Sequence, residues 1–418
     1  MEAVVAPDTS FAHRVAEARV RLIGADGRPL ADTAVEVAQR SHAFSFSNIG
    51  FDFVELANGR PRPGDQELAE RWLELFNTAT LPFYWRDFEP TPGAPRTGEL
   101  RATAAWFAEQ GVRLKGHPLV WHTLAPQWLL GETTLEVEKR LRGRIRREVT
   151  DFAGLIDTWD AINELVIMPV FTAEDNAVTP LAAHLGRLAM ARLAFGEARA
   201  ANPDATLLIN DFDLSSDYEK LIEELLESGL KIDAIGLQTH MHQGFRGEDD
   251  LDDILTRFSR FGLPLHFTET SLVSGELMPE HIVDLNDYVV DSWPSTAEGE
   301  ARQADELVRH YRTLVAHSPV AAINYWGISD AGSWLGAPIG LLRADGSPKP
   351  SFEALRGLIK GQWWVAPTTV RTDADGCFAL HGFLGGYQVR RLGGAEASVE
   401  CTLAAGVGQL DLTLPATE

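Results

Sequence analysis

The sequence contains little cysteine. Cys377 and Cys401 are the two cysteines among 418 residues, too few for a disulfide framework or for a zinc site made of four thiolates. The sequence leaves open whether these two thiols pair with each other. It therefore does not fix the redox environment in which the chain folds.

Basic charge and long apolar runs are lacking as well. Lysine and arginine number 37 against 60 aspartates and glutamates, so the formal net charge is −23. Such a surface repels nucleic-acid phosphates and anionic membrane surfaces, and we expect neither as a partner. No apolar run reaches the length of a membrane span, and the first residues lack the basic-then-apolar pattern of a signal peptide. The compartment, cytoplasmic or secreted, and the oligomeric state stay open.

What the sequence does contain is the composition of a globular protein, with 45% hydrophobic and 23% charged residues. Between the two ends, strand-like runs alternate with amphipathic helical stretches such as 67–76 and 135–155. Eight strands joined by helical crossovers are typical of an α/β protein with a (β/α)8 TIM barrel. The predicted strands are 43–50, 77–85, 112–121, 156–164, 205–212, 232–240, 263–269 and 320–327.

The two ends of the chain differ from this middle part. In 18–38, two alternating runs flank Asp26-Gly27, which is a hairpin signal, and four more alternating runs lie between 377 and 414. A lone hairpin is marginally stable in water, so we expect the ends to combine into one additional β-sandwich domain. The predicted domains are a discontinuous sandwich made of 1–42 and 362–418 and an inserted barrel, 43–361. The alternative is two separate β decorations, and strand pairing between the ends decides between these interpretations.

Two strand ends of the predicted barrel carry a glutamate, Glu164 and Glu269. Catalytic residues of this fold lie at the carboxyl ends of the strands. Two carboxyl groups there are the minimum for glycoside hydrolysis, in which one group donates a proton and the other stays ionised and attacks. Asn163 adjoins Glu164, and His240 on the neighbouring strand is placed to bond Glu269. For either glutamate alone, a structural role in a buried ion pair is an equally good interpretation.

Further side chains at the strand ends extend this hypothesis. Trp121, Trp326 and Trp334 present flat apolar faces of the kind that stack on sugar rings. His240 and His242 share one face of a strand, as two metal ligands would, but no third ligand stands out. We therefore expect no metal and no cofactor. Asp87 and Glu89, which follow the second strand, are expected to form a solvated pair.

The motifs of the central region resemble glycoside hydrolase family 10, the endo-β-1,4-xylanase family, over residues 70–357. They are GHPLVWH (116–122), WDAINE (159–164), INDFD (209–213), GLQTHMH (236–242), LHFTET (265–270), NYWGISDAGSWL (324–335) and PKPSFEAL (348–355). The resemblance implies a retaining, endo-1,4-β-xylanase-like glycoside hydrolase that cleaves β-glycosidic bonds by double displacement through a glycosyl-enzyme. Its partner would be a carbohydrate or glycoside, with a β-1,4-xylan-type glycan as the first expectation.

The same resemblance implies roles for individual residues. Glu164 resembles the acid/base and Glu269 the nucleophile of the family. The substrate-binding residues that it implies are His117, Trp121, Asn163, Gln238, His240, Trp326 and Trp334.

The second strand departs from the family pattern T-x-E-N-x-M-K-W, aligned on Trp85, which we also expect to bind substrate. The polar residues that bind the next sugar out are replaced by Thr80, Leu81, Tyr84 and, after the third strand, Leu124. The absence of one hydrogen bond to a sugar hydroxyl costs about 1–3 kcal/mol of binding free energy. We therefore expect that linear xylan is not the best substrate and that Phe83 and Tyr84 give the pocket a more apolar character.

Two other functions stay open. One is a glycosidase that releases sugars from a small glycoside such as a saponin, as tomatinase-type relatives in the family do; its product would be a free aglycone. The other is an inactive carbohydrate-binding protein, against which the complete set of Glu164, Glu269, Asn163 and His240 argues. The sandwich could serve carbohydrate binding, dimerisation or scaffolding.

Overall fold

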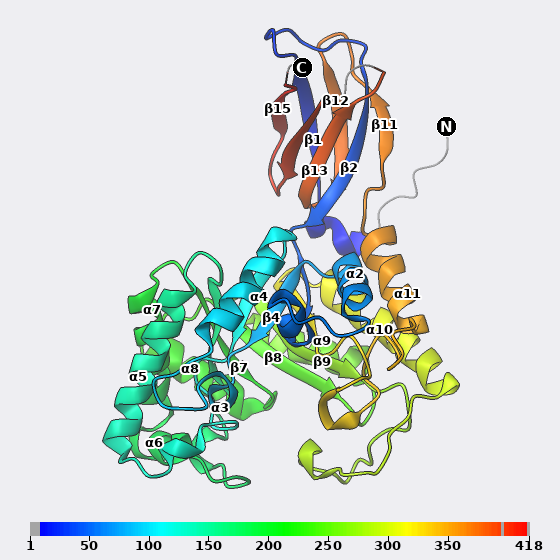
Figure 1. Cartoon of the computed structure of the whole chain (residues 1–418). Helices are drawn as coiled ribbons and strands as arrows, with labels where there is room; N and C mark the ends of the chain where they lie inside the picture. The colour runs from blue at the N-terminus through cyan, green and yellow to red at the C-terminus, as the bar shows by residue number, and fades with distance from the viewer. Residues whose placement is uncertain (1–8, 394–396, 416–418) are drawn as a thin grey trace.

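The computed structural model describes residues 9–393 and 397–415, and it consists of a closed barrel and a β-sandwich (Figure 1). Eight parallel strands close the barrel in the order β10-β3-β4-β5-β6-β7-β8-β9. All eight predicted strands form. They are β3 (Ser45–Ile49), β4 (Thr78–Pro82), β5 (Arg113–His117), β6 (Thr158–Asn163), β7 (Thr206–Asp211), β8 (Ala234–Met241), β9 (Leu265–Leu272) and β10 (Val320–Tyr325).

Helices surround the barrel strands. The longer ones are α2 (Asp65–Leu75), α4 (Thr97–Glu109), α5 (Thr134–Asp151), α6 (Val178–Leu185), α7 (Arg187–Ala201), α8 (Ser216–Glu227), α9 (Glu248–Ser259), α10 (Ala297–Ala316) and α11 (Pro350–Gly357). Two single turns, α1 (Val54–Ala57) and α3 (Trp85–Phe88), follow β3 and β4. None of these helices is both long and apolar enough to cross a membrane.

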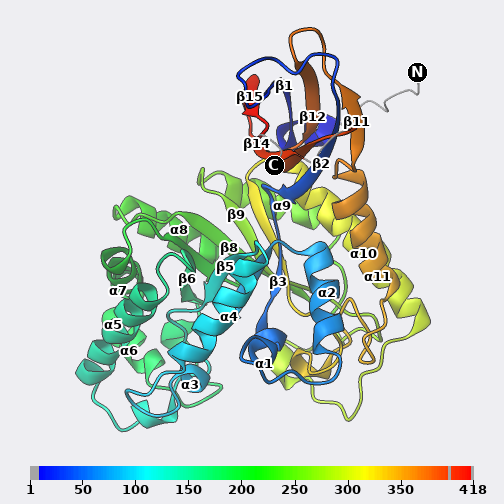
Figure 2. The ribbon, with the colours of Figure 1, turned by 45° about the horizontal axis from the view of Figure 1, so that its top comes forward.

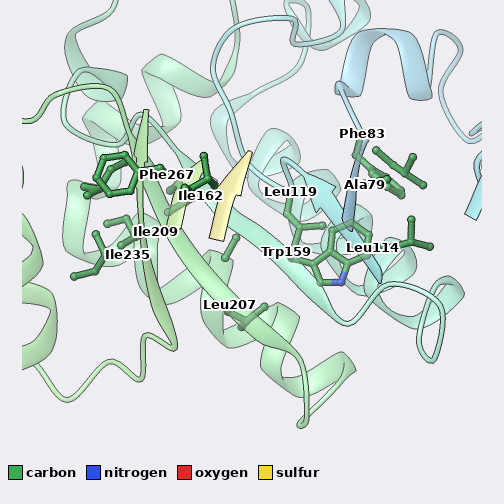
Figure 3. Close-up of a cluster of buried hydrophobic side chains, with 14 of the residues drawn as sticks. Ala79, Phe83, Leu114, Leu119, Trp159, Ile162, Leu207, Ile209, Ile235 and Phe267 are labelled. Atoms are coloured by element: carbon green, nitrogen blue, oxygen red, sulfur yellow. The ribbon is translucent and has the colours of Figure 1, made fainter. Parts of the chain in front are cut away.

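Apolar side chains fill the space between the strands and the helices (Figure 3). The Trp159 ring is fully buried and packs against Phe83 and Phe152 with ring centroids 4.8 and 6.3 Å away. A Cβ atom at Gly116 on the neighbouring strand would lie 2.1 Å from this ring, so the position admits glycine alone. This packing fixes the strand ends that carry the polar residues described below.

The β-sandwich combines both ends of the chain, as predicted. One sheet has the order β12-β1-β15 and the other β11-β2-β13-β14. The strands are β1 (Val15–Ile23), β2 (Ala34–His42), β11 (Thr368–Arg371), β12 (Cys377–Phe383), β13 (Gly385–Arg391), β14 (Ser398–Leu403) and β15 (Gln409–Thr413). Pairing of β1 with β12 and of β2 with β13 excludes two separate decorations. The exact domain boundaries stay a prediction.

The hairpin predicted at Asp26-Gly27 is wrong in one respect, because β1 and β2 belong to different sheets. A single bridge, Ile23 with Pro29, closes the turn. The physical reason is burial. Val20 and Leu22 of β1 and Val35 and Val37 of β2 line the same core, which two facing sheets enclose and a two-stranded ribbon would leave open to water.

The sandwich joins the barrel at the amino end of its strands, because β2 runs directly into β3 (Figures 1 and 2). The Arg14 guanidinium donates hydrogen bonds to the carbonyls of Val315, His317 and Val320 at 3.0, 2.7 and 2.6 Å. The Trp363 ring stacks on Phe46 at 5.9 Å. The sandwich therefore lies at the end of the barrel opposite to the carboxyl ends of the strands.

Candidate active site

Glu164 and Glu269 both lie at the carboxyl end of the barrel. Glu164 follows β6 and has a left-handed backbone with φ of 58°, which is uncommon for a residue other than glycine. Glu269 lies in β9, where the pairing with β8 shifts by one residue between Leu237 and Gln238. Such an irregularity re-aims side chains. It sets Gln238 directly opposite Glu269 at the barrel mouth.

A chain of amide groups links the two glutamates. Asn163 Nδ2 donates to Glu164 Oε1 at 3.1 Å, and Asn163 Oδ1 accepts from Asn210 Nδ2 at 2.8 Å. Asn210 Nδ2 also donates to Glu269 Oε1 at 3.0 Å. Gln238 Nε2 donates to Asn163 Oδ1 at 3.1 Å. The amides hold the two carboxyl groups in one connected network, and each amide orientation is fixed by its partners.

Glu164 is surrounded in a way that favours its protonated form. Burial raises its pKa to about 8, and the nearby carboxyl groups of Glu269 and Asp211 act in the same direction. The Trp121 indole opposes this effect, since its Nε1–H donates to Glu164 Oε2 at 2.7 Å. Burial likewise raises the pKa of Asp211 to about 7. A carboxyl group that keeps its proton near neutral pH is suited to act as an acid.

Glu269 has partners of the opposite character. His240 Nε2 lies 3.0 Å from Glu269 Oε2, and its other ring nitrogen lies 2.9 Å from the Ser271 hydroxyl. An ionised carboxylate only accepts hydrogen bonds, so Nε2 is the donor of this pair whenever Glu269 is ionised. With the bond from Asn210, both oxygens of Glu269 are oriented. These contacts fix the orientation of the carboxyl group.

His117 is held by a buried ion pair. Its Nδ1 lies 2.7 Å from Asp160 Oδ2, and Lys115 Nζ lies 2.8 Å from the same oxygen. Burial alone would raise the pKa of Asp160, but Lys115 and His117 hold it below its usual value. Because Nδ1 is used by Asp160, Nε2 of His117 points toward the site and lies 4.0 Å from Glu269 Oε1.

Aromatic rings enclose the two glutamates. Tyr84 contacts His117 and Trp121 at centroid distances of 5.7 and 5.6 Å. Trp326 lies 5.3 Å from His117, and Trp334 lies 4.8 Å from His240. The structure thus brings together ten of the eleven predicted site residues: Glu164, Glu269, His117, Trp121, Asn163, Gln238, His240, Trp326, Trp334 and Tyr84.

Trp85 is the predicted residue that the structure places elsewhere. Its ring is buried between Trp128 and the Arg144 guanidinium, and its Nε1 donates to Glu89 Oε2 at 3.1 Å. It sits in α3, one residue beyond Tyr84, and its side chain turns to the helical layer.

Two other expectations for this segment are wrong. Phe83 does not line the pocket, because its ring packs against Phe88, Phe152 and Trp159 in the core. Glu89 is not solvated either, since it is 4% exposed and paired with Arg147 at 2.8 Å. Its partner in that expectation, Asp87, is exposed.

Sequence reasoning gave no site role to Asn210, Asp211, Ser271 or Phe51. Asn210 and Asp211 end a strand in the INDFD motif, and that strand-end position was a usable signal. Ser271 follows Glu269 by two residues and therefore shares its face of β9. Phe51 follows β3 in an ordinary apolar context, and nothing in the sequence marks it.

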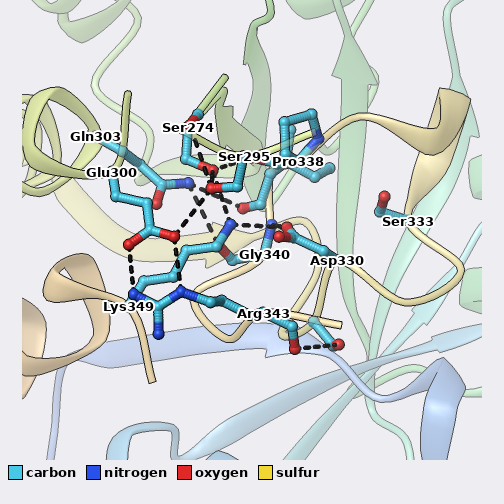
Figure 4. Close-up of polar contacts among 12 residues, drawn as sticks. Ser274, Ser295, Glu300, Gln303, Asp330, Ser333, Pro338, Gly340, Arg343 and Lys349 are labelled. Atoms are coloured by element: carbon cyan, nitrogen blue, oxygen red, sulfur yellow. Dashed lines mark hydrogen bonds and ion pairs between the residues drawn. The ribbon is translucent and has the colours of Figure 1, made fainter. Parts of the chain in front are cut away.

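The loop that carries Trp334 is anchored by a buried cation (Figure 4). Lys349 Nζ is fully buried and donates to Asp330 Oδ1 at 2.8 Å, to Ser274 Oγ at 2.8 Å and to the Gly340 carbonyl at 2.9 Å. Asp330 Oδ1 also accepts from the Gly340 amide at 2.9 Å. These bonds tie both ends of the loop to the segment that follows β9 and thereby set the position of Trp334.

The described ranges, 9–393 and 397–415, contain no group of three or more histidine, cysteine or acidic side chains arranged to hold a metal ion. His240 is used by Glu269 and Ser271. His242 is buried against Trp334 and Trp293 at 5.2 and 6.1 Å.

Comparisons with known proteins identify the family of the central part of the chain. The model of glycosyl hydrolase family 10 matches residues 78–357. An endo-1,4-beta-xylanase A from Xylanibacter ruminicola is 29% identical over 254 residues, which are 55% of this chain and 66% of that protein. An endo-1,4-beta-xylanase/feruloyl esterase from the same species is 26% identical over 290 residues, 62% of this chain and 39% of that protein. The chain thus spans less than two thirds of the length of both relatives.

One relative extends the likeness beyond the barrel. The anti-sigma-I factor RsgI6 of Acetivibrio thermocellus is 22% identical over 380 residues, 89% of this chain and 44% of that protein. Among solved structures, a GH10 protein from Paenibacillus barcinonensis has a TM-score of 0.63 at 22% identity, covering 75% of this chain and 94% of that one. Xylanase 10B from Thermotoga petrophila, solved with xylobiose, has a TM-score of 0.61 at 23% identity over 76% and 94%. The family model covers most of the chain, and the chain belongs to glycosyl hydrolase family 10.

Proposed function

We propose that the chain is a retaining β-glycosidase that acts on β-1,4-xylan-type glycans through a covalent glycosyl-enzyme. The observation that carries this proposal is the contrast between its two linked carboxyl groups. Burial raises the pKa of Glu164 to about 8, whereas Glu269 is bonded by Asn210 and His240. The names of the relatives, which are endo-1,4-beta-xylanases, support the substrate class.

In the first half of the reaction, a Glu269 oxygen attacks the anomeric carbon while the bond from that carbon to the leaving oxygen breaks. Glu164 gives its proton to the leaving oxygen, and the aglycone departs as a neutral alcohol. The amide of Asn163 lies between the two carboxyl groups, where a hydroxyl next to the anomeric carbon would contact it. The product of this half is a sugar esterified to Glu269.

In the second half, Glu164 acts as a base. Esterification removes the negative charge of Glu269, which is one of the causes that raise the pKa of Glu164. The pKa of Glu164 therefore falls when it must accept a proton from water. The activated water attacks the anomeric carbon, the ester bond to Glu269 breaks, and the free sugar leaves with its original configuration.

An inactive binding protein is a poorer interpretation of the same residues. Stacking on Trp121, Trp326 and Trp334 would suffice to bind a sugar. Binding gains nothing from a buried carboxyl group with a raised pKa beside an oriented carboxylate, and keeping these groups buried is costly. Proton donation and attack are the chemistry that uses both.

The first experiment measures reducing-sugar release from soluble xylan and from aryl β-glycosides of xylose and glucose. The Glu269→Ala variant serves as the blank and Glu276→Gln, an exposed change in the following loop, as the matched control. We expect release by the native chain and the control, with the β-anomer formed first in proton NMR. Hydrolysis that is unchanged in Glu269→Ala, or a first product with inverted configuration, would contradict the proposal.

A further inference from the structure

Four aromatic rings that follow adjacent barrel strands contact one another at the carboxyl end of the barrel. We call Phe51, Tyr84, Trp121 and Trp326 the aromatic wall. Phe51 contacts Tyr84 and Trp326 edge to face at 5.7 and 5.8 Å, and Tyr84 contacts Trp121 at 5.6 Å. His117 touches three of the four rings at 5.3 to 6.3 Å. The rings therefore form one packed surface.

The wall comes from four neighbouring strands. Trp326, Phe51, Tyr84 and Trp121 follow β10, β3, β4 and β5, which are adjacent in the closed barrel. A sugar ring held between two aromatic faces separates them by about 7–8 Å, because each contact needs about 3.5–4.0 Å. The edge-to-face contacts within the wall are shorter than this. No sugar passes between these rings while they stay in contact.

The β4 side chains that precede Tyr84 offer no free polar group to a second sugar. Thr80 and Leu81, which precede Tyr84 in the chain, are both 0% exposed. The Thr80 hydroxyl is used internally and donates to Asn324 Oδ1 at 3.1 Å. Between Thr80 and Tyr84, the Tyr84 hydroxyl is therefore the one polar side-chain group without an internal hydrogen bond.

The wall flanks the sugar that becomes bonded to Glu269. His117, which packs against Tyr84 and Trp326, has its Nε2 4.0 Å from Glu269 Oε1. The leaving group departs on the side of Glu164, at the end of β6 and past the last strand of the wall. Phe51, Tyr84 and Trp326 thus lie on the glycone side, and Trp121, which bonds Glu164, lies between the two sides.

We propose that the aromatic wall limits the glycone side to a single sugar, so that the enzyme removes one terminal sugar at a time from a β-glycan or β-glycoside. This inference rests on the proposed function and narrows it to cleavage at the non-reducing end of the glycan. The Tyr84 hydroxyl has no hydrogen-bond partner among the described residues. It lies near both carboxyl groups, because after burial Glu269 and Glu164 are the main causes that raise its pKa.

The test compares aryl glycosides with one and two sugars, namely 4-nitrophenyl β-xyloside and β-xylobioside, and the glucose pair. It also follows the first products from xylotetraose whose reducing end has been reduced to the alditol. We expect kcat/KM for the one-sugar substrate to equal or exceed that for the two-sugar substrate, and xylose as the first product. A tenfold or larger preference for the two-sugar substrates, with xylobiose released first, would overturn the inference and leave the proposed function intact. No turnover of any pair would contradict the proposed function itself.

Variants of the aromatic wall distinguish the effect of its rings from the effect of the Tyr84 hydroxyl. Tyr84→Ala and Phe51→Ala open the wall, and we expect each to shift the kcat/KM ratio toward the two-sugar substrate by about tenfold. Tyr84→Phe keeps the ring and should leave the ratio unchanged. Phe212→Ala is the matched control, because Phe212 is 47% exposed and follows β7 across the barrel. A ratio that stays constant in both opening variants, with fold confirmed by circular dichroism, would overturn the inference.

Discussion

The Trp121 indole donates a hydrogen bond of 2.7 Å to Glu164 Oε2, while burial of the same carboxyl group raises its pKa to about 8. The two effects oppose each other, because the hydrogen bond favours the charged form and burial favours the neutral form. The balance between them sets the pH range in which Glu164 keeps a proton to donate. Two predictions concern this balance.

The first prediction is that kcat/KM falls as the pH rises through about 8, because Glu164 loses the proton that it must donate. In Glu164→Gln the alkaline limb should disappear, since this residue no longer titrates. Activity of the variant should survive on an activated aryl glycoside, whose leaving group needs no proton, and drop by about a hundredfold or more on unactivated substrates. A pH profile of kcat/KM on both substrate types measures this. An alkaline limb that persists in the variant would assign it to another group.

The second prediction concerns Trp121→Phe, which keeps a ring but removes the donor to Glu164. Loss of a bond to the charged form raises the pKa of Glu164 further, so the alkaline limb should move to higher pH. Trp334→Phe is the matched control, because Trp334 contacts His240 and not Glu164; it should change KM without moving the limb. An alkaline limb at the same pH in Trp121→Phe and the native chain would argue against this coupling.

The third prediction concerns the buried cation below the Trp334 loop. Lys349→Met leaves Asp330 without its charge partner, and breaking a buried pair from one side costs about 3–5 kcal/mol. The double variant Lys349→Met/Asp330→Asn should recover part of this loss. Urea unfolding of the single and double variants measures it, with the exposed Lys220→Met as a control. Equal stability of Lys349→Met and the native chain would contradict the anchoring role.

The fourth prediction concerns the split sandwich. Removing 362–418 takes β12 and β15 away from β1 and uncovers Val20 and Leu22, which are 0% exposed. We expect this truncation to aggregate, because an unpaired apolar strand is a template for association. Size-exclusion chromatography measures it. Removing 1–42 together with 362–418 should leave more soluble protein than the single truncation, and a soluble monomer from the single truncation would contradict the shared domain.

The sequence predicted the barrel from local pattern, whereas it predicted the site residues from motifs that resemble glycoside hydrolase family 10. Alternating strands and amphipathic helices have one dominant closed arrangement, and that arrangement carries the strand ends to one face. Once the strands are assigned, Glu164 and Glu269 are expected at the same end of the barrel. Trp85 was not, because adjacent residues at a strand end can turn to opposite sides, and packing with Trp128 and Arg144 decides which.

By itself the sequence determined the fold class, since periodicity suffices for it, and it placed two glutamates at strand ends. Strand pairing in the structure decided that both chain ends form one sandwich. Only the tertiary structure decided the pKa of Glu164 and which aromatic rings pack together beside the two glutamates. The raised pKa of Glu164 comes from burial and from carboxyl groups distant in the chain. The contact of Phe51 with Tyr84 joins residues that follow separate strands. Burial and ring packing depend on residues that are distant in the sequence and become neighbours only when the barrel closes.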